Sequence, residues 1–107
     1  MIKYTSDKTF ETDVINSKVP VLLDFYADWC GPCKQLSPVL EQLATEMQNN
    51  LNIFKCNVDD NPETPSKLMV RGIPSLMIFK DGKLMDSKVG ALPKAALNDW
   101  IKKTLAI

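Results

Sequence analysis

A short stretch with two cysteines, Trp29–Lys34 (WCGPCK), constrains the fold of this chain more than any other feature. It directly follows Val21–Ala27, a compact apolar run with the length and composition of a buried strand. After it, apolar residues recur at helical spacing as far as Met47. Two cysteines separated by two residues, in a turn that leads from a strand into a helix, are typical of a thiol redox pair.

The position of each cysteine predicts its role. Cys30 should lie at the helix N-terminus, where free N–H groups and the positive end of the helix dipole stabilise a thiolate. It should also be the more exposed of the two, so we expect Cys30 to be the attacking thiolate and Cys33, one turn further in, to resolve the mixed disulfide. Gly31 lets the backbone turn closely, and Pro32 fixes φ at the start of the helix. A zinc site is disfavoured because only one further cysteine exists and histidine is absent.

The composition narrows the function classes further. The chain has 107 residues, of which 45% are hydrophobic, and we expect a single domain over residues 1–107. Its 13 basic and 13 acidic residues form no basic stripe, which disfavours nucleic-acid binding. No apolar run approaches the ~20 residues that span a bilayer, and no signal-peptide core is present. Three cysteines are too few for a stapled secreted scaffold, so we expect a reducing compartment, most simply the cytoplasm.

The rest of the pattern predicts an α/β domain. Leu51–Val58 is the next expected strand, joined to the first by a parallel crossover. Asp81-Gly82 predicts a tight hairpin between Ser75–Lys80 and Lys83–Val89, so the sheet should be mixed. Further helices are expected over Asp7–Asn16 behind a Ser6 cap, from Asp59 to near Met69, and from Pro93 onward, on both faces of the sheet.

Two charged residues interrupt the apolar strands. Asp24 should be desolvated, which raises its pKa and would let it deprotonate Cys33 through a water. The alternative is that Asp24 lies at an exposed strand end. Lys55 either snorkels to solvent or pairs with Asp24 across neighbouring strands. Cys56 should be a small core residue, and the pattern alone leaves Pro74 as an ordinary trans proline at a strand start.

From Phe10 to Leu105 the chain resembles the thioredoxin family, in particular its small single-domain bacterial type. The hexapeptide with its Gly-Pro insert carries most of the resemblance. The other matching blocks are Val21–Pro38, Asn57–Pro62, Arg71–Phe79 and Val89–Ala91. The resemblance implies an α/β thioredoxin fold, with a mixed five-stranded sheet flanked by four helices.

The resemblance also implies site roles. Cys30 matches the nucleophile, Cys33 the resolving thiol, Asp24 the buried acid and Lys55 its partner. Pro74 matches the family's cis-proline beside the cysteine pair. The Ile73 backbone would bind an extended substrate segment by strand addition. The implied substrate-binding surface comprises Trp29, Gly31, Pro32, Gly72, Ile73, Pro74, Gly90 and Ala91.

By this resemblance the chain is expected to be a monomeric general protein-disulfide reductase, acting in electron transport and cell redox homeostasis. Its partners would be disulfide-containing proteins and a separate NADPH-dependent flavoprotein, thioredoxin reductase. No cofactor of its own is expected, since the chain has no dinucleotide-binding glycine pattern. Two alternatives stay open: an oxidase or isomerase of the same fold, and a binding subunit that docks on a partner regardless of redox state.

Overall fold

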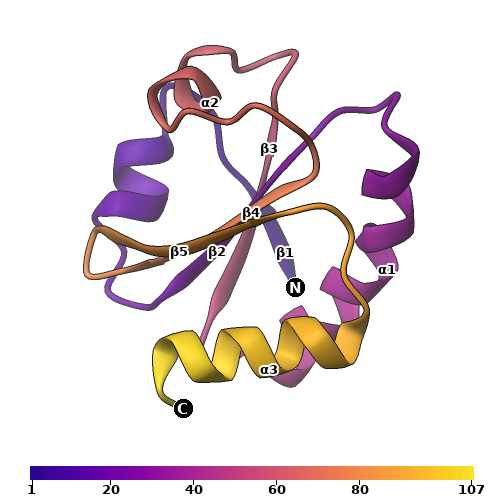
Figure 1. The fold of residues 1–107 in the computed structure, drawn as a ribbon. Helices are drawn as coiled ribbons and strands as arrows, with labels where there is room; N and C mark the ends of the chain where they lie inside the picture. The colour runs from indigo at the N-terminus through magenta and orange to yellow at the C-terminus, as the bar shows by residue number, and fades with distance from the viewer.

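A five-stranded mixed sheet forms the centre of the structure, a computed structural model that describes residues 1–107 (Figure 1). The strands lie in the order β1-β3-β2-β4-β5. Their bounds are Ile2–Tyr4 for β1, Val21–Tyr26 for β2, Asn52–Asn57 for β3, Ser75–Lys80 for β4 and Lys83–Val89 for β5. β2 is central and runs parallel to β3 but antiparallel to β4, so the predicted mixed sheet is confirmed.

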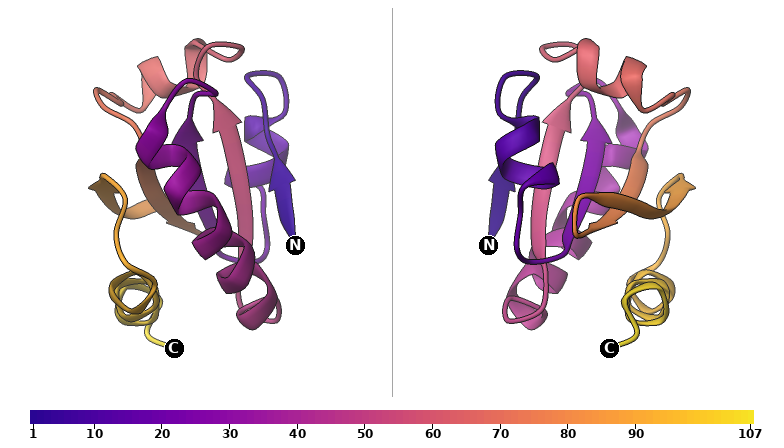
Figure 2. Two further views of the ribbon diagram at one scale, coloured as in Figure 1. Left: turned by 90° about the vertical axis from the view of Figure 1, so that its right-hand side faces the viewer. Right: turned by 90° about the vertical axis from the view of Figure 1, so that its left-hand side faces the viewer.

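Four helices flank the sheet. They are the π-helix η1 (Glu11–Ile15) and the α-helices α1 (Gly31–Glu46), α2 (Glu63–Lys67) and α3 (Lys94–Leu105). Figure 2 shows α1 and η1 on opposite faces of the strands, which confirms the expectation of helices on both faces. None of these helices is long and apolar enough to cross a membrane.

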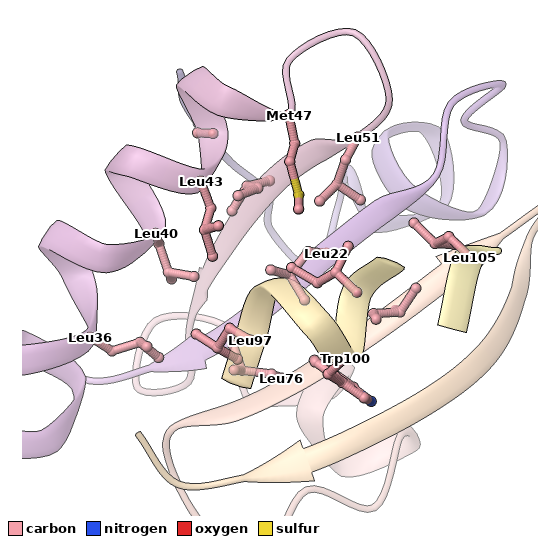
Figure 3. Close-up of a cluster of buried hydrophobic side chains, with 14 residues drawn as sticks. Leu22, Leu36, Leu40, Leu43, Met47, Leu51, Leu76, Leu97, Trp100 and Leu105 are labelled. Carbon is pink, nitrogen blue, oxygen red and sulfur yellow. The ribbon is translucent and has the colours of Figure 1, made fainter. Parts of the chain in front are cut away.

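Side chains alternate between the two faces of the sheet along each strand, and they pack into a separate core on each face. On one face, Leu22 of β2 packs with residues of α1 and α3 in a cluster that includes Trp100 and Leu105 (Figure 3). On the other face, Leu23 of β2 packs with residues of β3 and β4 and with Val14 of η1. The same alternation assigns Asp24 to the face of Leu22, which is the face that α1 covers.

The β4–β5 hairpin is confirmed, with its predicted two-residue turn. Asp81 and Gly82 both have positive φ, 54° and 77°, as a type I′ turn requires. Glycine is needed at the second position for a further reason, since a Cβ on Gly82 would lie 2.9 Å from the carbonyl oxygen of Ile15. The turn therefore packs closely against the end of η1.

The first helix differs from the prediction. Ser6 does cap a turn, because its hydroxyl oxygen accepts the N–H of Thr9 at 3.2 Å and its carbonyl accepts the N–H of Phe10 at 2.8 Å. The regular helix, however, covers only Glu11–Ile15 rather than Asp7–Asn16. Strand β1 was not predicted from the residue pattern, because three residues are too few to show alternation.

Candidate active site

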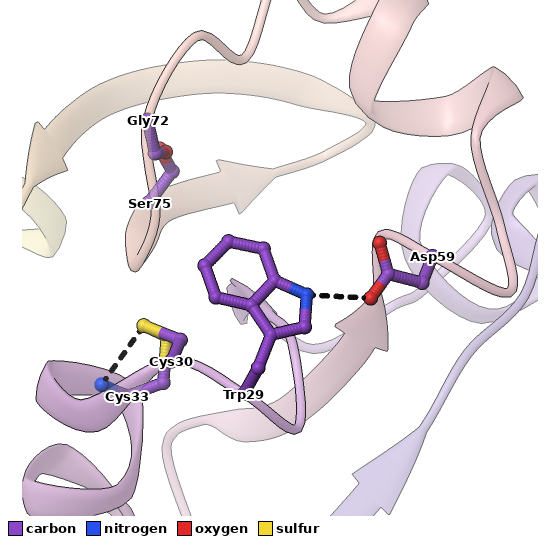
Figure 4. The surroundings of a disulfide bond; sticks show 6 residues. All are labelled: Trp29, Cys30, Cys33, Asp59, Gly72 and Ser75. Carbon is purple, nitrogen blue, oxygen red and sulfur yellow. Dashed lines mark hydrogen bonds between the residues drawn. A yellow bond between two sulfur atoms is a disulfide. The ribbon is translucent and has the colours of Figure 1, made fainter.

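Cys30 and Cys33 form a disulfide at the N-terminus of α1, with their Cα atoms 5.2 Å apart (Figure 4). Cys30 is the N-cap residue, and its Sγ accepts the backbone N–H of Cys33 at 3.2 Å. Exposure does not distinguish the two cysteines as expected, since they are only 4% and 3% exposed. The helix end does distinguish them, because a donated N–H and the helix dipole favour negative charge on the Cys30 sulfur.

The Ile73–Pro74 loop lies beside this disulfide. The Ile73–Pro74 peptide bond is cis, and Ile73 packs against the small cluster that Ala27 forms with both cysteines. Two hydrogen bonds fix the loop: the Ser75 hydroxyl donates to the Gly72 carbonyl, and the Gly90 N–H donates to the Pro74 carbonyl at 2.8 Å. The sequence pattern alone favoured a trans proline, and only the family resemblance implied the cis form.

Trp29 directly precedes Cys30 and is 70% exposed. Its indole Nε1 donates to Asp59 Oδ2 at 2.8 Å (Figure 4). Asp59 follows β3, and its own N–H donates to Asn57 Oδ1 at 2.9 Å. The large apolar ring is therefore held at the surface by a hydrogen bond across 30 residues of chain.

A groove of about 430 Å³ runs between Trp29 and the Ile73 loop. We call it the Trp29 groove. Three residues of the predicted substrate surface line it, namely Trp29, Gly72 and Ile73. The other five, Gly31, Pro32, Pro74, Gly90 and Ala91, do not line it. The remaining walls come from Val58, Pro62, Pro65, Ser66, Val70 and Arg71.

Asp24 is completely buried in β2, so the alternative of an exposed strand end is wrong. Burial raises the pKa of Asp24 from 3.8 to about 7, while the positive charge of Lys55 opposes that shift. Neither carboxyl oxygen has a hydrogen-bond partner. A buried carboxyl without donors favours its neutral form, and at about 7 the group can exchange a proton near neutral pH.

Lys55 lies directly opposite Asp24 in the parallel β2–β3 register and is 7% exposed. The two side chains make no ion pair within 4.0 Å, a contact found only between Lys94 and Glu46. The Lys55 ammonium instead lies 4.3 Å from the centre of the Tyr26 ring. Lys55 therefore acts on Asp24 through space, and a cation–π contact holds its head group.

A small hollow of about 140 Å³ lies between Lys55 and the Cys33 end of the disulfide. It is large enough for water by the usual volume criterion. Cys33 and Lys55 both line it, and its other walls come from Tyr26, Ala27, Asp28, Lys34 and Ser37. Asp24 does not itself line the hollow, but it lies directly opposite Lys55 in the β2–β3 register.

The comparison with known proteins decides the family. The thioredoxin family model matches residues 1–103. The chain belongs to the thioredoxin family. Thioredoxin of Rhodospirillum rubrum is 50% identical over 104 residues, which cover 97% of this chain and 100% of that protein. Thioredoxin of Acidithiobacillus ferridurans is 52% identical over 97% of this chain and 96% of its own length, and that of Haemophilus influenzae 47% identical over 95% of both.

Family membership and the disulfide together establish the activity. A thioredoxin with a redox-active cysteine pair is a thiol–disulfide oxidoreductase, and this chain carries that pair as Cys30–Cys33. It reduces protein disulfides by dithiol–disulfide exchange. The fold is the α/β thioredoxin fold that the resemblance implied, a five-stranded mixed sheet with four helices.

The third cysteine, Cys56, is not part of the redox disulfide. Cys56 is fully buried in the core on the face of β3 opposite Lys55. Burial raises the pKa of its thiol to about 11, so the thiolate is scarce at neutral pH. The prediction that Cys56 is a core residue is therefore confirmed.

Sequence reasoning missed several residues that surround the cysteines. Asp59 was used only as the start of a helix, and nothing in its spacing points to Trp29. Pro62 enters the sequence analysis only at the end of a matching block and Pro65 not at all, although both line the Trp29 groove. Asp7 lies in the predicted first helix, yet in the structure its carboxylate accepts the N–H and hydroxyl of Thr64 at 2.8 and 2.7 Å. That contact fastens α2, which supplies one groove wall.

Proposed function

We propose that Cys30 is the nucleophile and Cys33 the resolving thiol of this reductase. The Cys30 thiolate attacks one sulfur of a substrate disulfide, forms a mixed disulfide and expels the other substrate sulfur as a thiolate. The Cys33 thiolate then attacks the Cys30 sulfur and releases the second substrate thiolate. The substrate gains two electrons, and the chain is left with the Cys30–Cys33 disulfide. The observation that carries this order is the N-cap position of Cys30, which receives the Cys33 N–H.

Asp24 would accept the proton that Cys33 loses before it resolves the mixed disulfide. Its pKa of about 7 suits a base that must take a proton near neutral pH and later give it up. The hollow beside Cys33 offers a place for the water that would carry the proton. Lys55, on the adjacent strand and lining the same hollow, would stabilise the ionised form of Asp24 once the proton has arrived.

Protein substrates would bind as extended segments along the Ile73 loop. Backbone hydrogen bonds to Ile73 would hold the segment, and strand addition of this kind favours breadth over sequence selectivity. The apolar floor of the groove would take substrate side chains of many shapes. The proposed surface comprises Trp29, Gly31, Pro32, Gly72, Ile73, Pro74, Gly90 and Ala91.

The partners and setting follow from the family. A separate flavoprotein, thioredoxin reductase, would return electrons from NADPH to the Cys30–Cys33 disulfide. Residues 1–107 would act as one domain and as a monomer, in the cytoplasm, where reduced thiols are maintained. No bound cofactor takes part in the exchange, because two thiols supply both electrons.

A coupled assay tests this function. With NADPH, a thioredoxin reductase and a protein disulfide such as insulin, the chain should support continuous NADPH oxidation that stops when the chain is omitted. A Cys30→Ser/Cys33→Ser double variant should support none, which separates the reductase from a redox-independent binding subunit. Absence of NADPH oxidation with the unmodified chain, while the reductase turns over its own organism's thioredoxin, would contradict the proposal.

A further inference from the structure

Met69 has a backbone conformation that its side chain disfavours. Its φ is 59°, in the left-handed region where a Cβ crowds the backbone. Only two other residues with a side chain share this sign of φ, Asp81 in the hairpin turn and Ala106 at the end of α3. Met69 follows the C-cap of α2, Leu68, a place where glycine is the usual residue. A methionine at this position therefore carries a conformational cost.

The folded chain gains little from the Met69 side chain in return. It is 71% exposed, so it contributes little to either core. Non-glycine residues held in the left-handed region cluster at binding sites, where the cost is tolerated for function. Methionine is also the most adaptable apolar side chain and is common on surfaces that bind many partners.

Met69 lines a hollow that continues the Trp29 groove. This Met69 hollow has a volume of about 280 Å³. It shares Val70, Arg71 and Gly72 with the Trp29 groove, so these three residues form the wall between the two depressions. Across from Met69, the hollow is lined by Leu84 and Val89 of β5, which are 44% and 70% exposed.

We infer that the Met69 hollow is a second substrate subsite, which takes an apolar side chain from the polypeptide that flanks the target disulfide. The inference rests on the proposed function and extends it. Successive side chains of an extended segment point to opposite sides, so a segment laid across the wall at Val70–Gly72 reaches both depressions. The charged side chains lining the hollow, Arg71 and Lys88, are both cationic. The preferred segment therefore pairs its apolar residue with an acidic neighbour.

The test uses Met69→Gly and Met69→Gln with disulfide-bonded peptides that carry Leu-Glu, Ser-Glu or Leu-Lys beside the target cysteine. Met69→Gly should raise Tm, because the strained residue is relieved, yet raise KM for the Leu-Glu peptide about three- to tenfold. Met69→Gln keeps the size of the side chain and should raise the same KM. Neither variant should change kcat or the rate with 5,5′-dithiobis(2-nitrobenzoate), which is too small to reach the Met69 hollow.

Ala106→Gly is the matched control. It relieves the same left-handed strain at the exposed end of α3, away from the Met69 hollow, so it should raise Tm without changing any KM. An unchanged KM for the Leu-Glu peptide in both Met69 variants, or equal KM values for all three peptides with the unmodified chain, would overturn the subsite while leaving the reductase intact. Failure of the unmodified chain to reduce any peptide would instead refute the proposed function itself, and the subsite with it.

Discussion

Cys30→Ser should lower the rate of protein-disulfide reduction by at least about a thousandfold, because a serine hydroxyl is not ionised near neutral pH and forms no mixed disulfide. Cys33→Ser should behave differently. Its Cys30 thiolate still attacks, so the variant should accumulate a stable mixed disulfide with the substrate instead of turning over. The asymmetry follows from the N-cap position of Cys30 and the N–H that it receives from Cys33.

Mass spectrometry of each variant after incubation with oxidised insulin measures this difference. One adduct per chain is expected for Cys33→Ser and none for Cys30→Ser. Cys56→Ala serves as the control and should keep the turnover of the unmodified chain, since Cys56 lies in the core on the opposite side of β3 from Lys55. The assigned roles would be reversed if Cys33 in the Cys30→Ser variant formed adducts as fast as Cys30 does in the Cys33→Ser variant.

Asp24→Asn should stabilise the fold by an amount that grows with pH. The pKa of Asp24 is about 7 in the folded chain, above the ordinary value of 3.8. Folding therefore favours the protonated form, and the stability that this form contributes is lost as pH rises from about 4 through about 7. Relative to low pH, this linkage lowers the stability of the unmodified chain by about 2 kcal/mol at about pH 5, where only the unfolded chain is ionised, and by roughly 4 kcal/mol at about pH 8.5. Asparagine removes that pH-dependent cost.

Urea unfolding of both proteins across this pH range measures the effect. Asp86→Asn gives a control of opposite sign: the hydrogen bond from the Trp100 indole lowers the pKa of Asp86, so its contribution is lost as pH falls. If the stability difference between Asp24→Asn and the unmodified chain were the same at all pH values, burial would not raise the pKa of Asp24.

The same substitution should slow the second chemical step. Without a base near Cys33, release of substrate from the mixed disulfide should fall at least about tenfold near neutral pH, and the gap should narrow as solvent hydroxide takes over at higher pH. Quenched-flow measurement of the mixed disulfide separates this step from the first attack, which Asp24→Asn should leave unchanged. Identical release rates across pH would remove Asp24 from the mechanism.

Much of the fold was predictable because its signals are local. Residues close together in the sequence specify the strand–turn–helix around Cys30 and the Asp81-Gly82 turn. The apolar stripe of α1 likewise comes from one continuous segment. β1 could not be found from the pattern, because three exposed or half-buried residues carry no periodicity. The π-helical form of η1 could not be found either, because a helical stripe does not show which hydrogen-bond spacing the backbone adopts.

The site was less predictable where it depends on contacts between distant residues. The burial of Asp24 followed from its apolar neighbours, but the position of the Lys55 ammonium over Tyr26 did not, since strand register alone cannot say where a flexible side chain ends. The bond from Trp29 to Asp59 joins residues 30 positions apart. The left-handed conformation of Met69 leaves no trace in the sequence, because methionine has no preference for it.

The Cys30–Cys33 dithiol is a reductant, and the reduction potential of this pair is the most direct test of that role. The protein is equilibrated with reduced and oxidised glutathione, and the state of the pair is followed by Trp29 emission in a Trp100→Phe variant, since Trp29 adjoins the disulfide. We expect about −270 mV, the general value for thioredoxins. A potential near about −120 mV would mark the chain as an oxidant and contradict the direction of electron flow proposed for it.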